Sequence, residues 1–285
     1  MIIARIQGRV GNELFQASAL HNRLARGEHL VLIGPKVALD SPTLDGRITR
    51  VGFRRTIVID VLTHLFRLAR GLRLIGRIEA EECDGRLMPR VSQGILPIRF
   101  SCESFFQDPA IVSGGPTVRL PASAQAHARS IHDNDLGDIR VAVHVRRGDY
   151  LRWGPYGPAA LPWEYYEAAI LRIRGLFNSG TSFRFLFLSD DLDYVAKQTL
   201  GRDDCVAVDC EESVALAVMA ASDYLVLSAS TFSWWGSELA RRRNPSRVAV
   251  APLYWAGWPG GSWYPSPFAS DQSLEWLSAQ SNVEG

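Results

Sequence analysis

The sequence predicts an α/β protein built from two halves, on three observations. The chain opens with a short apolar strand, a glycine turn and a helical pattern, which together begin an α/β unit. After residue 139, nearly continuous apolar runs alternate with helical patterns, as in a parallel sheet covered on both faces. Between these parts, residues 113–138 are rich in Gly, Pro, Ala, Ser and Asp, which is typical of a linker. The 285 residues suffice for two domains.

We therefore expect a first half over residues 1–130 and a second half over residues 131–285. The first half begins with a strand at 1–6, a helical pattern through 14–24 and a strand at 29–33, and the linker contains a short helix. The second half repeats a strand-then-helix order with short connections. Its expected strands are 139–145, 183–188, 205–208, 224–227 and a last one at 247–251, and its helices are 162–177, 192–200, 212–221 and 232–242.

Composition excludes several classes of protein. The formal net charge of +1, with 21% charged residues, argues against a surface built throughout for nucleic acid or anionic lipid. The four cysteines form no CxxC pair and no zinc-finger spacing. No stretch of about 20 apolar residues is present, and no secretory signal opens the chain, so we expect a cytoplasmic protein.

Arginine supplies 29 of the 31 basic residues, because Lys36 and Lys197 are the only lysines. A GC-rich genome explains this bias, and so does a need for planar forks that grip phosphate. Six of the arginines lie in residues 54–77 among many aliphatic side chains, with Asp60 as the one acid. We favour the solvated face of a core helix there. The alternative is a basic amphipathic helix that contacts a membrane or an anionic acceptor.

Ligands of open parallel sheets bind beyond the carboxyl ends of the strands, which selects three segments here. The first contains Arg146 and Arg147, which follow the strand 139–145. Two adjacent guanidiniums fit a diphosphate, and the alternative is a cluster of salt bridges with local acids. His144 lies on the opposite side of that strand from its valine neighbours, where a structural histidine is the ordinary interpretation.

The second segment, Ser228–Ser233, places four hydroxyl groups at the start of a helix. One serine or threonine suffices as N-cap, so the surplus hydroxyls and the helix N–H groups make a candidate anion cradle from Ser230, Thr231 and Ser233. Trp234 and Trp235 follow, and core packing is their favoured role.

The third segment contains Asp190, Asp191 and Asp193 and allows three interpretations. It can bind a divalent metal through a DxD pattern, cap the helix that begins at Leu192, or accept hydrogen bonds from a guanine base. Near the N-terminus, the turn at Gly8–Glu13 brings backbone close to a ligand or is an ordinary βα turn.

Four motifs together resemble one enzyme family. The string His144-Val-Arg-Arg-Gly-Asp-Tyr150 is similar to the HxRRGDY signature of the inverting α-1,2-fucosyltransferases, glycosyltransferase family eleven. Leu188–Asp191 and Ser230–Gly236 resemble its second and third motifs, and Gly11–Gln16 resembles its N-terminal GNQ(M/L)FQ. The motifs occur in the family's order from residue 8 to about residue 240.

The resemblance implies a GT-B-like fold with two Rossmann-type halves and an active site in the cleft between them. It implies transfer of L-fucose from GDP-β-L-fucose to a sugar 2-hydroxyl with inversion, on a glycan acceptor that we expect to end in galactose. No metal and no nucleic acid take part, and the cell location is cytoplasmic, with peripheral contact at the inner face of the membrane as one option. Arg146 and Arg147 then hold the diphosphate with help from the three hydroxyls, Asp191 beside Asp190 reads guanine, and His144 and Asn12 lie beside the donor.

Two positions depart from the family pattern, with Glu13 in place of the usual Gln and Arg9 in place of the second glycine. Candidates for the general base are Asp149, which we favour, Glu13, and the segment Glu103–Asp108. Two alternative functions remain. One is a metal-dependent nucleotide-sugar transferase that uses Asp191 and Asp193, and the other is a non-catalytic nucleotide-binding or adhesion module, the latter through Arg147-Gly148-Asp149.

Overall fold

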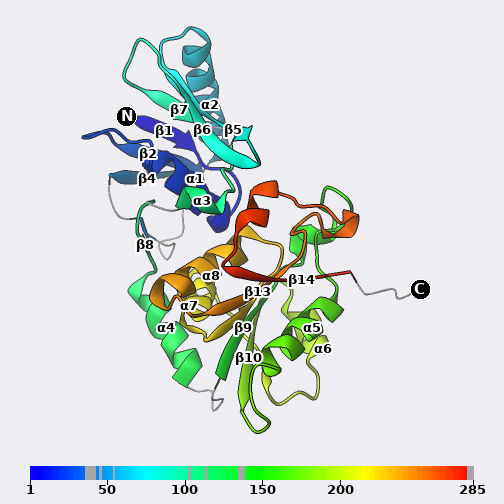
Figure 1. Cartoon of the computed structure of the whole chain (residues 1–285). Coiled ribbons are helices and arrows are strands. Elements are labelled where there is room, and N and C mark those ends of the chain that lie inside the picture. The colour runs from blue at the N-terminus through cyan, green and yellow to red at the C-terminus, as the bar shows by residue number, and fades with distance from the viewer. Residues whose placement is uncertain are drawn as a thin grey trace. The chain divides into compact units, whose positions relative to one another are not determined.

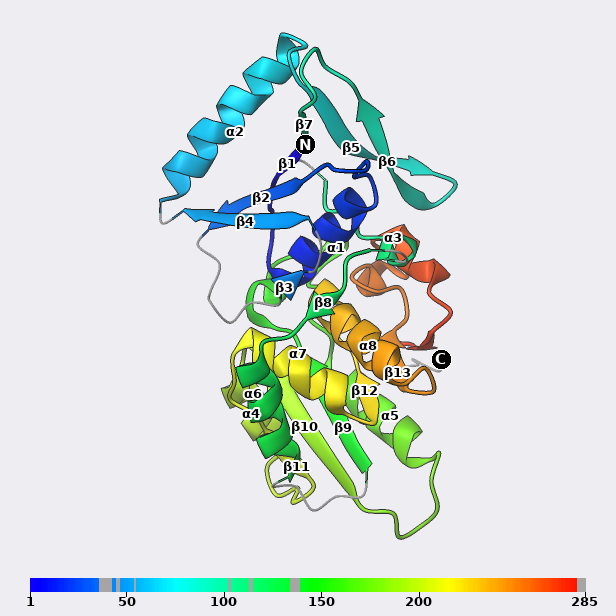
Figure 2. The ribbon, with the colours of Figure 1, turned by 90° about the vertical axis from the view of Figure 1, so that its left-hand side faces the viewer.

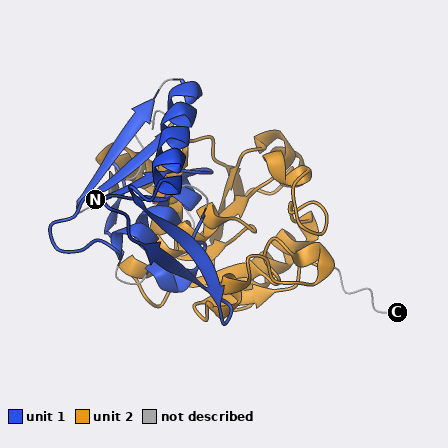
Figure 3. Cartoon of the chain, turned by 90° about the horizontal axis from the view of Figure 1, so that it is seen from above, with its two compact units in different colours: residues 1–121 blue, residues 122–285 orange. Residues whose placement is uncertain are grey.

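The computed structural model describes residues 1–35, 43–44, 47–53, 55–101, 104–112, 115–133 and 139–280. The chain divides into two compact units, Met1–Pro121 (unit 1) and Ala122–Gly285 (unit 2), shown in Figure 3. This division lies nine residues before the one expected from the linker composition. The helix α4 (Ala122–Asp133) explains the shift, because it packs against α7 (Glu212–Ala221) of unit 2, where His132 Nε2 lies 3.3 Å from the Val218 carbonyl oxygen.

Unit 1 is a six-stranded sheet with a helix on each face (Figures 1 and 2). Its strand order is β4-β2-β1-β7-β5-β6, and every neighbouring pair is parallel except the hairpin β5–β6. The strands are β1 (Ile2–Arg5), β2 (Leu30–Pro35), β4 (Ile48–Phe53), β5 (Gly76–Cys83), β6 (Arg86–Ser92) and β7 (Arg99–Ser101), with the short pair β3 (Thr43–Leu44) and β8 (Val118–Arg119) beside them. The helices are α1 (Val10–His21), α2 (Thr56–Gly71) and α3 (Pro109–Val112).

The alternation of side chains along β1 explains the two helical layers of unit 1. Ile2 and Ala4 pack with residues of α1, whereas Ile3 packs with Ile59 of α2. The Phe66 ring of α2 stacks on Phe100 of β7 with 4.8 Å between centroids. Both helices are therefore fixed by apolar burial on the sheet.

Unit 2 is a six-stranded, fully parallel sheet in the order β11-β10-β9-β12-β13-β14. Its strands are β9 (Ile139–Val145), β10 (Phe183–Ser189), β11 (Cys205–Ala207), β12 (Tyr224–Val226), β13 (Val248–Pro252) and β14 (Leu274–Leu277). The remaining helices are α5 (Trp163–Arg174), α6 (Leu192–Gln198) and α8 (Thr231–Arg243), with 3₁₀ turns η1 (Gly148–Leu151), η2 (Trp258–Gly260) and η3 (Ser266–Ser270). Successive strands run outward from β9 on one side and from β12 on the other. The topological switch point of this sheet therefore lies between β9 and β12, where open α/β sheets bind ligands.

The two faces of the unit 2 sheet carry different helices, as Figure 1 shows. Val141, Val143 and Val145 pack with side chains of α5 and α6. His144 points to the opposite face, where it meets α8. This confirms the orientation expected from the sequence.

Several boundaries agree with the sequence analysis, and two features differ. The observed bounds of β9 and α7 are the expected ones. The strand at β13 is not the last, because β14 pairs with it in parallel. The hairpin β5–β6 was not expected, since its residues are largely polar and follow directly on the arginine-rich run. Among the described residues, no helix combines the length and the apolar character needed to cross a bilayer.

The carboxylate of Glu28 supports the start of unit 1 and gives a pH-dependent prediction. It pairs with Arg99 of β7 and with the amino group of Met1, and it accepts a 2.8 Å hydrogen bond from the Ala25 N–H. Burial raises the pKa of Glu28, but these contacts outweigh burial and lower the pKa to about 2. A lowered pKa means stabilisation that is complete above the ordinary carboxyl range and is lost as pH falls toward 2.

We therefore expect Glu28→Gln to destabilise the protein at pH 7 by about 1 kcal/mol, a modest amount because the pair is partly solvated. The difference in melting temperature from the parent protein should shrink between about pH 4.5 and pH 2. Thermal melts of both proteins across that interval provide the measurement. A difference that stays constant with pH would contradict the charge assignment.

Candidate functional site

His144, at the end of β9, forms a buried hydroxyl cluster with the start of α8. Its Nδ1 lies 2.8 Å from Ser228 Oγ and 2.5 Å from Ser233 Oγ, and the two serine oxygens are 2.8 Å apart. The Ser228 N–H also donates to Ser233 Oγ at 3.1 Å. Phe232 packs beside the imidazole with 5.1 Å between ring centroids. The cluster therefore joins β9 to β12 and α8 across the switch point.

Arg146 is 9% exposed and is held by two acids of unit 2. Its Nη1 donates to Asp190 and its Nη2 donates to Asp149, and its guanidinium lies over the Tyr150 ring at 5.2 Å from the centroid. The salt-bridge cluster with local acids, which the sequence left as the alternative to a diphosphate site, is thus present at Arg146. Arg146 is the member of the arginine pair whose two Nη groups both donate to carboxylates.

Arg147 presents its guanidinium differently. Its Nε donates to Asp191 Oδ2 at 3.0 Å, its backbone N–H donates to Asp190 Oδ1 at 2.8 Å, and its guanidinium carbon lies 3.4 Å from the centroid of the Tyr194 ring. Arg147 thus contacts these described residues through its backbone N–H and its Nε, and its Nη1 and Nη2 groups are available to bind a ligand. A flat guanidinium on an aromatic ring loses little conformational freedom when it binds an anion.

Gly148 allows the carboxylate of Asp190 to lie against the arginine segment. A Cβ at residue 148 would approach Asp190 Oδ2 to 2.6 Å, which is closer than nonbonded atoms tolerate. Asp190 uses Oδ2 for Arg146 and Oδ1 for the Arg147 N–H. The contacts of Asp190 with Arg146 and with the Arg147 N–H therefore require a residue without a side chain at position 148.

Asp191 is the N-cap of α6, one of the three expectations for this segment. Its Oδ1 accepts from the Tyr194 N–H at 3.1 Å, while Ser189 Oγ accepts from its own N–H at 2.9 Å. The hydrogen bond from Arg147 is the main cause that lowers the pKa of Asp191. Both carboxylate oxygens thus have protein partners. Asp193 lies in the first turn of the same helix.

Ser230 is the N-cap of α8, and its Oγ accepts from the Phe232 N–H at 3.2 Å. Thr231 is the first residue of the helix and is partly exposed, whereas Ser233 is fully buried in the His144 cluster. Burial raises the pKa of the nearby Tyr150 hydroxyl to about 12. The three hydroxyl residues predicted from the sequence therefore have different roles. Ser230 is the N-cap, Thr231 is the partly exposed first residue of the helix, and Ser233 is a buried partner of His144.

The two tryptophans of α8 pack in the core, as expected. Trp234 is 3% exposed and donates from Nε1 to Asp271 at 2.6 Å, and Trp235 is fully buried. On the opposite face of the sheet, Tyr165 Oη donates to the Leu227 carbonyl at 2.8 Å. These contacts fix the end of β12 immediately before the serine cluster.

Unit 1 has a corresponding polar pair at its own switch point, between β1 and β7. After β1, the chain turns at Gly8 (φ +81°) into α1. Gln16 braces this turn, because its Nε2 donates to the Gln7 carbonyl at 2.7 Å. Asn12 Oδ1 accepts from Gln107 Nε2 at 2.7 Å. Asn12 therefore lies with Gln107, which falls inside the candidate segment Glu103–Asp108 but was not itself named from the sequence.

The other candidates of unit 1 have separate environments. Glu13 is 8% exposed and pairs with Arg50 of β4, with 2.6 Å between Oε1 and Nε. Burial raises the pKa of Glu13, and Arg50 opposes that change. Glu103 lies outside the described residues. The structure thus groups His144, Arg146, Arg147, Asp149, Asp190, Asp191 and the three hydroxyls in unit 2, while Asn12 and Glu13 belong to unit 1.

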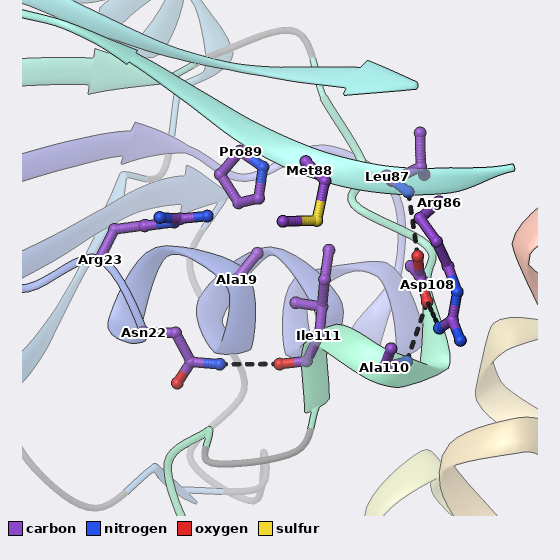
Figure 4. A pocket seen from close by; sticks show the side chains of 10 residues that line it. All are labelled: Ala19, Asn22, Arg23, Arg86, Leu87, Met88, Pro89, Asp108, Ala110 and Ile111. Carbon is purple, nitrogen blue, oxygen red and sulfur yellow. Dashed lines mark hydrogen bonds and ion pairs between the residues drawn. The ribbon is translucent and has the colours of Figure 1, made fainter. Parts of the chain in front are cut away.

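A cavity of about 350 Å³ in unit 1 lies between α1, β6 and α3 (Figure 4). Asp108, which is 1% exposed, has one oxygen near Arg86 and the Ala110 N–H, and the other oxygen accepts from the Leu87 N–H at 2.9 Å. Figure 4 shows these bonds joining β6 to the start of α3. Asp108 is thus held in a structural role and is not available as a base in this arrangement.

A sequence model described as "Glycosyl transferase family 11" matches residues 119–256, which include β9, β10, β12, α8 and every candidate residue of unit 2. The matched segment is similar to family 11 sequences. Two curated relatives from Escherichia coli support it. The "O-antigen biosynthesis glycosyltransferase WbnK" is 29% identical over 53% of this chain and 54% of its own length. The "Alpha-1,2-colitosyltransferase" is 27% identical over 47% of each chain. The chain therefore spans about half the length of the curated relatives it matches.

Solved structures show the fold of this chain. A family 9 glycosyl transferase from Veillonella parvula covers 97% of this chain and 85% of its own, at 12% identity and a TM-score of 0.56. The POFUT1 complex with GDP-fucose covers 84% and 94%, at 13% identity and a TM-score of 0.53. E. coli ADP-heptose heptosyltransferase II covers 97% and 89%, at 10% identity and a TM-score of 0.52. The expected GT-B-like α/β class is confirmed.

Proposed function

We propose that the protein is an inverting α-1,2-fucosyltransferase that transfers L-fucose from GDP-β-L-fucose to the 2-hydroxyl of a glycan. The observation that carries the proposal is Arg147, whose guanidinium is fixed on the Tyr194 ring with its two Nη groups open to an anion, at the switch point of a parallel sheet. The family 11 match covers this whole arrangement.

The donor is bound at the carboxyl ends of β9, β10 and β12. The Nη groups of Arg147 hold the diphosphate, with the N-terminus of α8 as a second group of donors. Ser230 and Thr231 lie at that helix start, and the His144–Ser228–Ser233 cluster supports it. Asp190 and Asp191 lie directly after β10. We assign guanine recognition to Asp191, because each of its carboxylate oxygens can accept a second hydrogen bond besides those from Arg147 and Tyr194.

Catalysis follows from stabilisation of the leaving group. The bond between the fucosyl C1 and the β-phosphate oxygen breaks, and charge develops on that phosphate. A fixed guanidinium stabilises the developing charge without a proton transfer. The acceptor 2-hydroxyl bonds to C1 from the opposite face and gives up its proton. We assign the proton acceptor to Asp149, whose side chain is 64% exposed while Oδ1 accepts from Arg146. Asn12 of unit 1 is assigned to the phosphate–sugar region.

A thermal-shift panel followed by a transfer assay tests this proposal. We expect GDP and GDP-fucose to raise the melting temperature and UDP-sugars to leave it unchanged. Glycans that end in galactose should accept fucose at the 2-hydroxyl. The panel includes GDP-colitose, because one relative is named a colitosyltransferase. Stabilisation by GDP without transfer to any acceptor would favour the nucleotide-binding module, and an absence of stabilisation would refute the proposal.

We also propose that transfer needs no metal. Both oxygens of Asp191 have protein partners, the Tyr194 N–H and Arg147 Nε, which supports a capping role in place of a DxD site. Turnover in excess EDTA is the test. Loss of activity in EDTA that Mn²⁺ restores would support the metal-dependent alternative with Asp191 and Asp193.

The proposed location is the cytoplasm, at the inner face of the membrane. An acceptor glycan that is built on a lipid carrier would be available there to an enzyme that binds the membrane peripherally.

A further inference from the structure

The outer face of α2 is apolar, in contrast to the solvated arginine face favoured by the sequence analysis. The inner face of this helix packs on the sheet through Ile59 and Phe66. On the opposite side, six aliphatic side chains are 37–70% exposed and form one stripe at helical spacing. They are Ile57, Val58, Val61, Leu65, Leu68 and Leu72, which we call the outer face of α2.

The apolar surface continues beyond the helix. Leu74, Ile95 and Leu96 are 39–77% exposed. The segment that precedes β7 follows the end of α2, because the Ile95 N–H donates to the Arg73 carbonyl at 3.1 Å and the Leu96 N–H donates to the Leu74 carbonyl at 2.8 Å. A continuous aliphatic surface of this kind is uncommon on soluble monomers and marks a binding face.

A basic cavity of about 430 Å³ adjoins the C-terminal end of α2. Its lining, all of it within unit 1, contains Arg67, Arg70, Arg73, Arg77, Gly71, Ile75, Ser92 and Gln93. Arg70 and Arg77 share the carboxylate of Glu79, at 3.5 and 2.6 Å. The lone acid of α2, Asp60, is paired with Arg5 of β1 at 2.8 Å.

Arg73 occupies a position where glycine is the usual residue. Its φ is +57°, and the bonds from Arg73 N–H to the Arg70 carbonyl and from Leu74 N–H to the Ala69 carbonyl close a Schellman motif. A side chain at this position strains the backbone. The cation at Arg73 is thus present in spite of a local conformational cost.

We propose that the outer face of α2 and this basic cavity bind an anionic phospholipid membrane. The aliphatic stripe inserts at the boundary between headgroups and acyl chains, while the arginines hold lipid phosphates at its edge. The four arginines lie beside an aliphatic stripe, and the acid of α2, Asp60, is paired with Arg5, which favours an anionic lipid surface over a protein partner. This proposal rests on the proposed function only for the choice of membrane face, which is the inner one.

Vesicle co-sedimentation with the full chain tests this proposal at low ionic strength. We expect the protein to pellet with vesicles of phosphatidylcholine containing about 30% phosphatidylglycerol and to stay in solution with pure phosphatidylcholine. The double variant L65Q/L68Q should lower the bound fraction about ten-fold, since each substitution removes an apolar side chain from the bilayer boundary. Arg73→Gly should lower affinity about five-fold and raise the melting temperature, because it removes a charge and relieves the strained position.

Matched controls use similar residues elsewhere. Leu200→Gln changes a leucine that is 86% exposed in unit 2, and Arg90→Gln changes an exposed arginine of β6; both should bind vesicles like the parent protein. Transfer to a soluble acceptor should be equal in all variants, so loss of lipid binding and loss of catalysis are separate results. The proposal is overturned if the parent protein does not pellet, if the controls lose binding as much as L65Q/L68Q, or if L65Q/L68Q instead dissolves a dimer in light scattering.

Discussion

Replacement of Arg147 by alanine is expected to lower kcat for glycosyl transfer by about 10²–10³-fold. The substitution removes the guanidinium fork that we assign to the diphosphate, where charge develops as GDP leaves. It should also weaken GDP binding, because the ground-state anion uses the same fork. The fold should tolerate the change, since the Arg147 side chain lies on the surface ring of Tyr194 and its backbone bond to Asp190 is kept.

Two further variants make this experiment specific. Arg147→Lys keeps the charge but not the planar fork or the ring contact, so it should recover only a small part of the activity. Arg172→Ala removes an arginine of α5 that is exposed and pairs with Glu275, and it should leave kcat unchanged. Full activity of Arg147→Ala at saturating and at low donor concentration would refute the diphosphate assignment.

Replacement of Gly148 by alanine is expected to lower kcat about 10- to 100-fold with little change in melting temperature. The new Cβ would lie 2.6 Å from Asp190 Oδ2, so the carboxylate must move away from Arg146 and from the Arg147 N–H. Both guanidiniums then lose the support that fixes them. The rate falls because small displacements of a positioned charge reduce its effect on the transition state.

Gly175→Ala is the matched control for Gly148→Ala. Gly175 is the C-cap of α5 in a right-handed conformation, and an added Cβ would meet carbonyl oxygens at an ordinary 3.5 Å. We expect this variant to transfer at the parental rate. Equal rates for the Gly148→Ala variant and the parent would show that Asp190 is not needed to position the arginines.

Sequence patterns predict the centre of the unit 2 sheet because β9 and β10 are largely apolar runs of seven residues bounded by turns. The cap at Asp191 follows from residue chemistry and position, and the orientation of His144 follows from strand alternation. The hairpin β5–β6 was missed, although its Asp84–Gly85 turn, with φ of +52° and +71°, is a known hairpin signal. Charged and apolar residues alternate in these strands, which is a further strand signal. We did not separate it from the arginine-rich segment that runs into β5.

The sequence does not predict those contacts of the site that join elements far apart along the chain. Tyr194 lies on α6, and only the pairing of β9 with β10 brings its ring under Arg147. Gln107 is 95 residues from Asn12, and a single glutamine carries no signal of that pairing. The exposed stripe of α2 shares its apolar residue types with the stripe that packs on the sheet. Hydrophobic periodicity assigns such a helix to the core. It does not show which of the two apolar faces packs on the sheet and which one is exposed.

The carboxylates that pair with Arg146 and Arg147 are counter-ions at the candidate diphosphate site. A diphosphate that enters does not meet a bare positive charge, because Asp149, Asp190 and Asp191 already neutralise part of it. In the proposed function the diphosphate binds beside these carboxylates, so the gain in free energy on binding is smaller than for two unpaired arginines. For the proposed reaction, the same partial neutralisation favours release of the nucleotide product at the expense of tight ground-state binding.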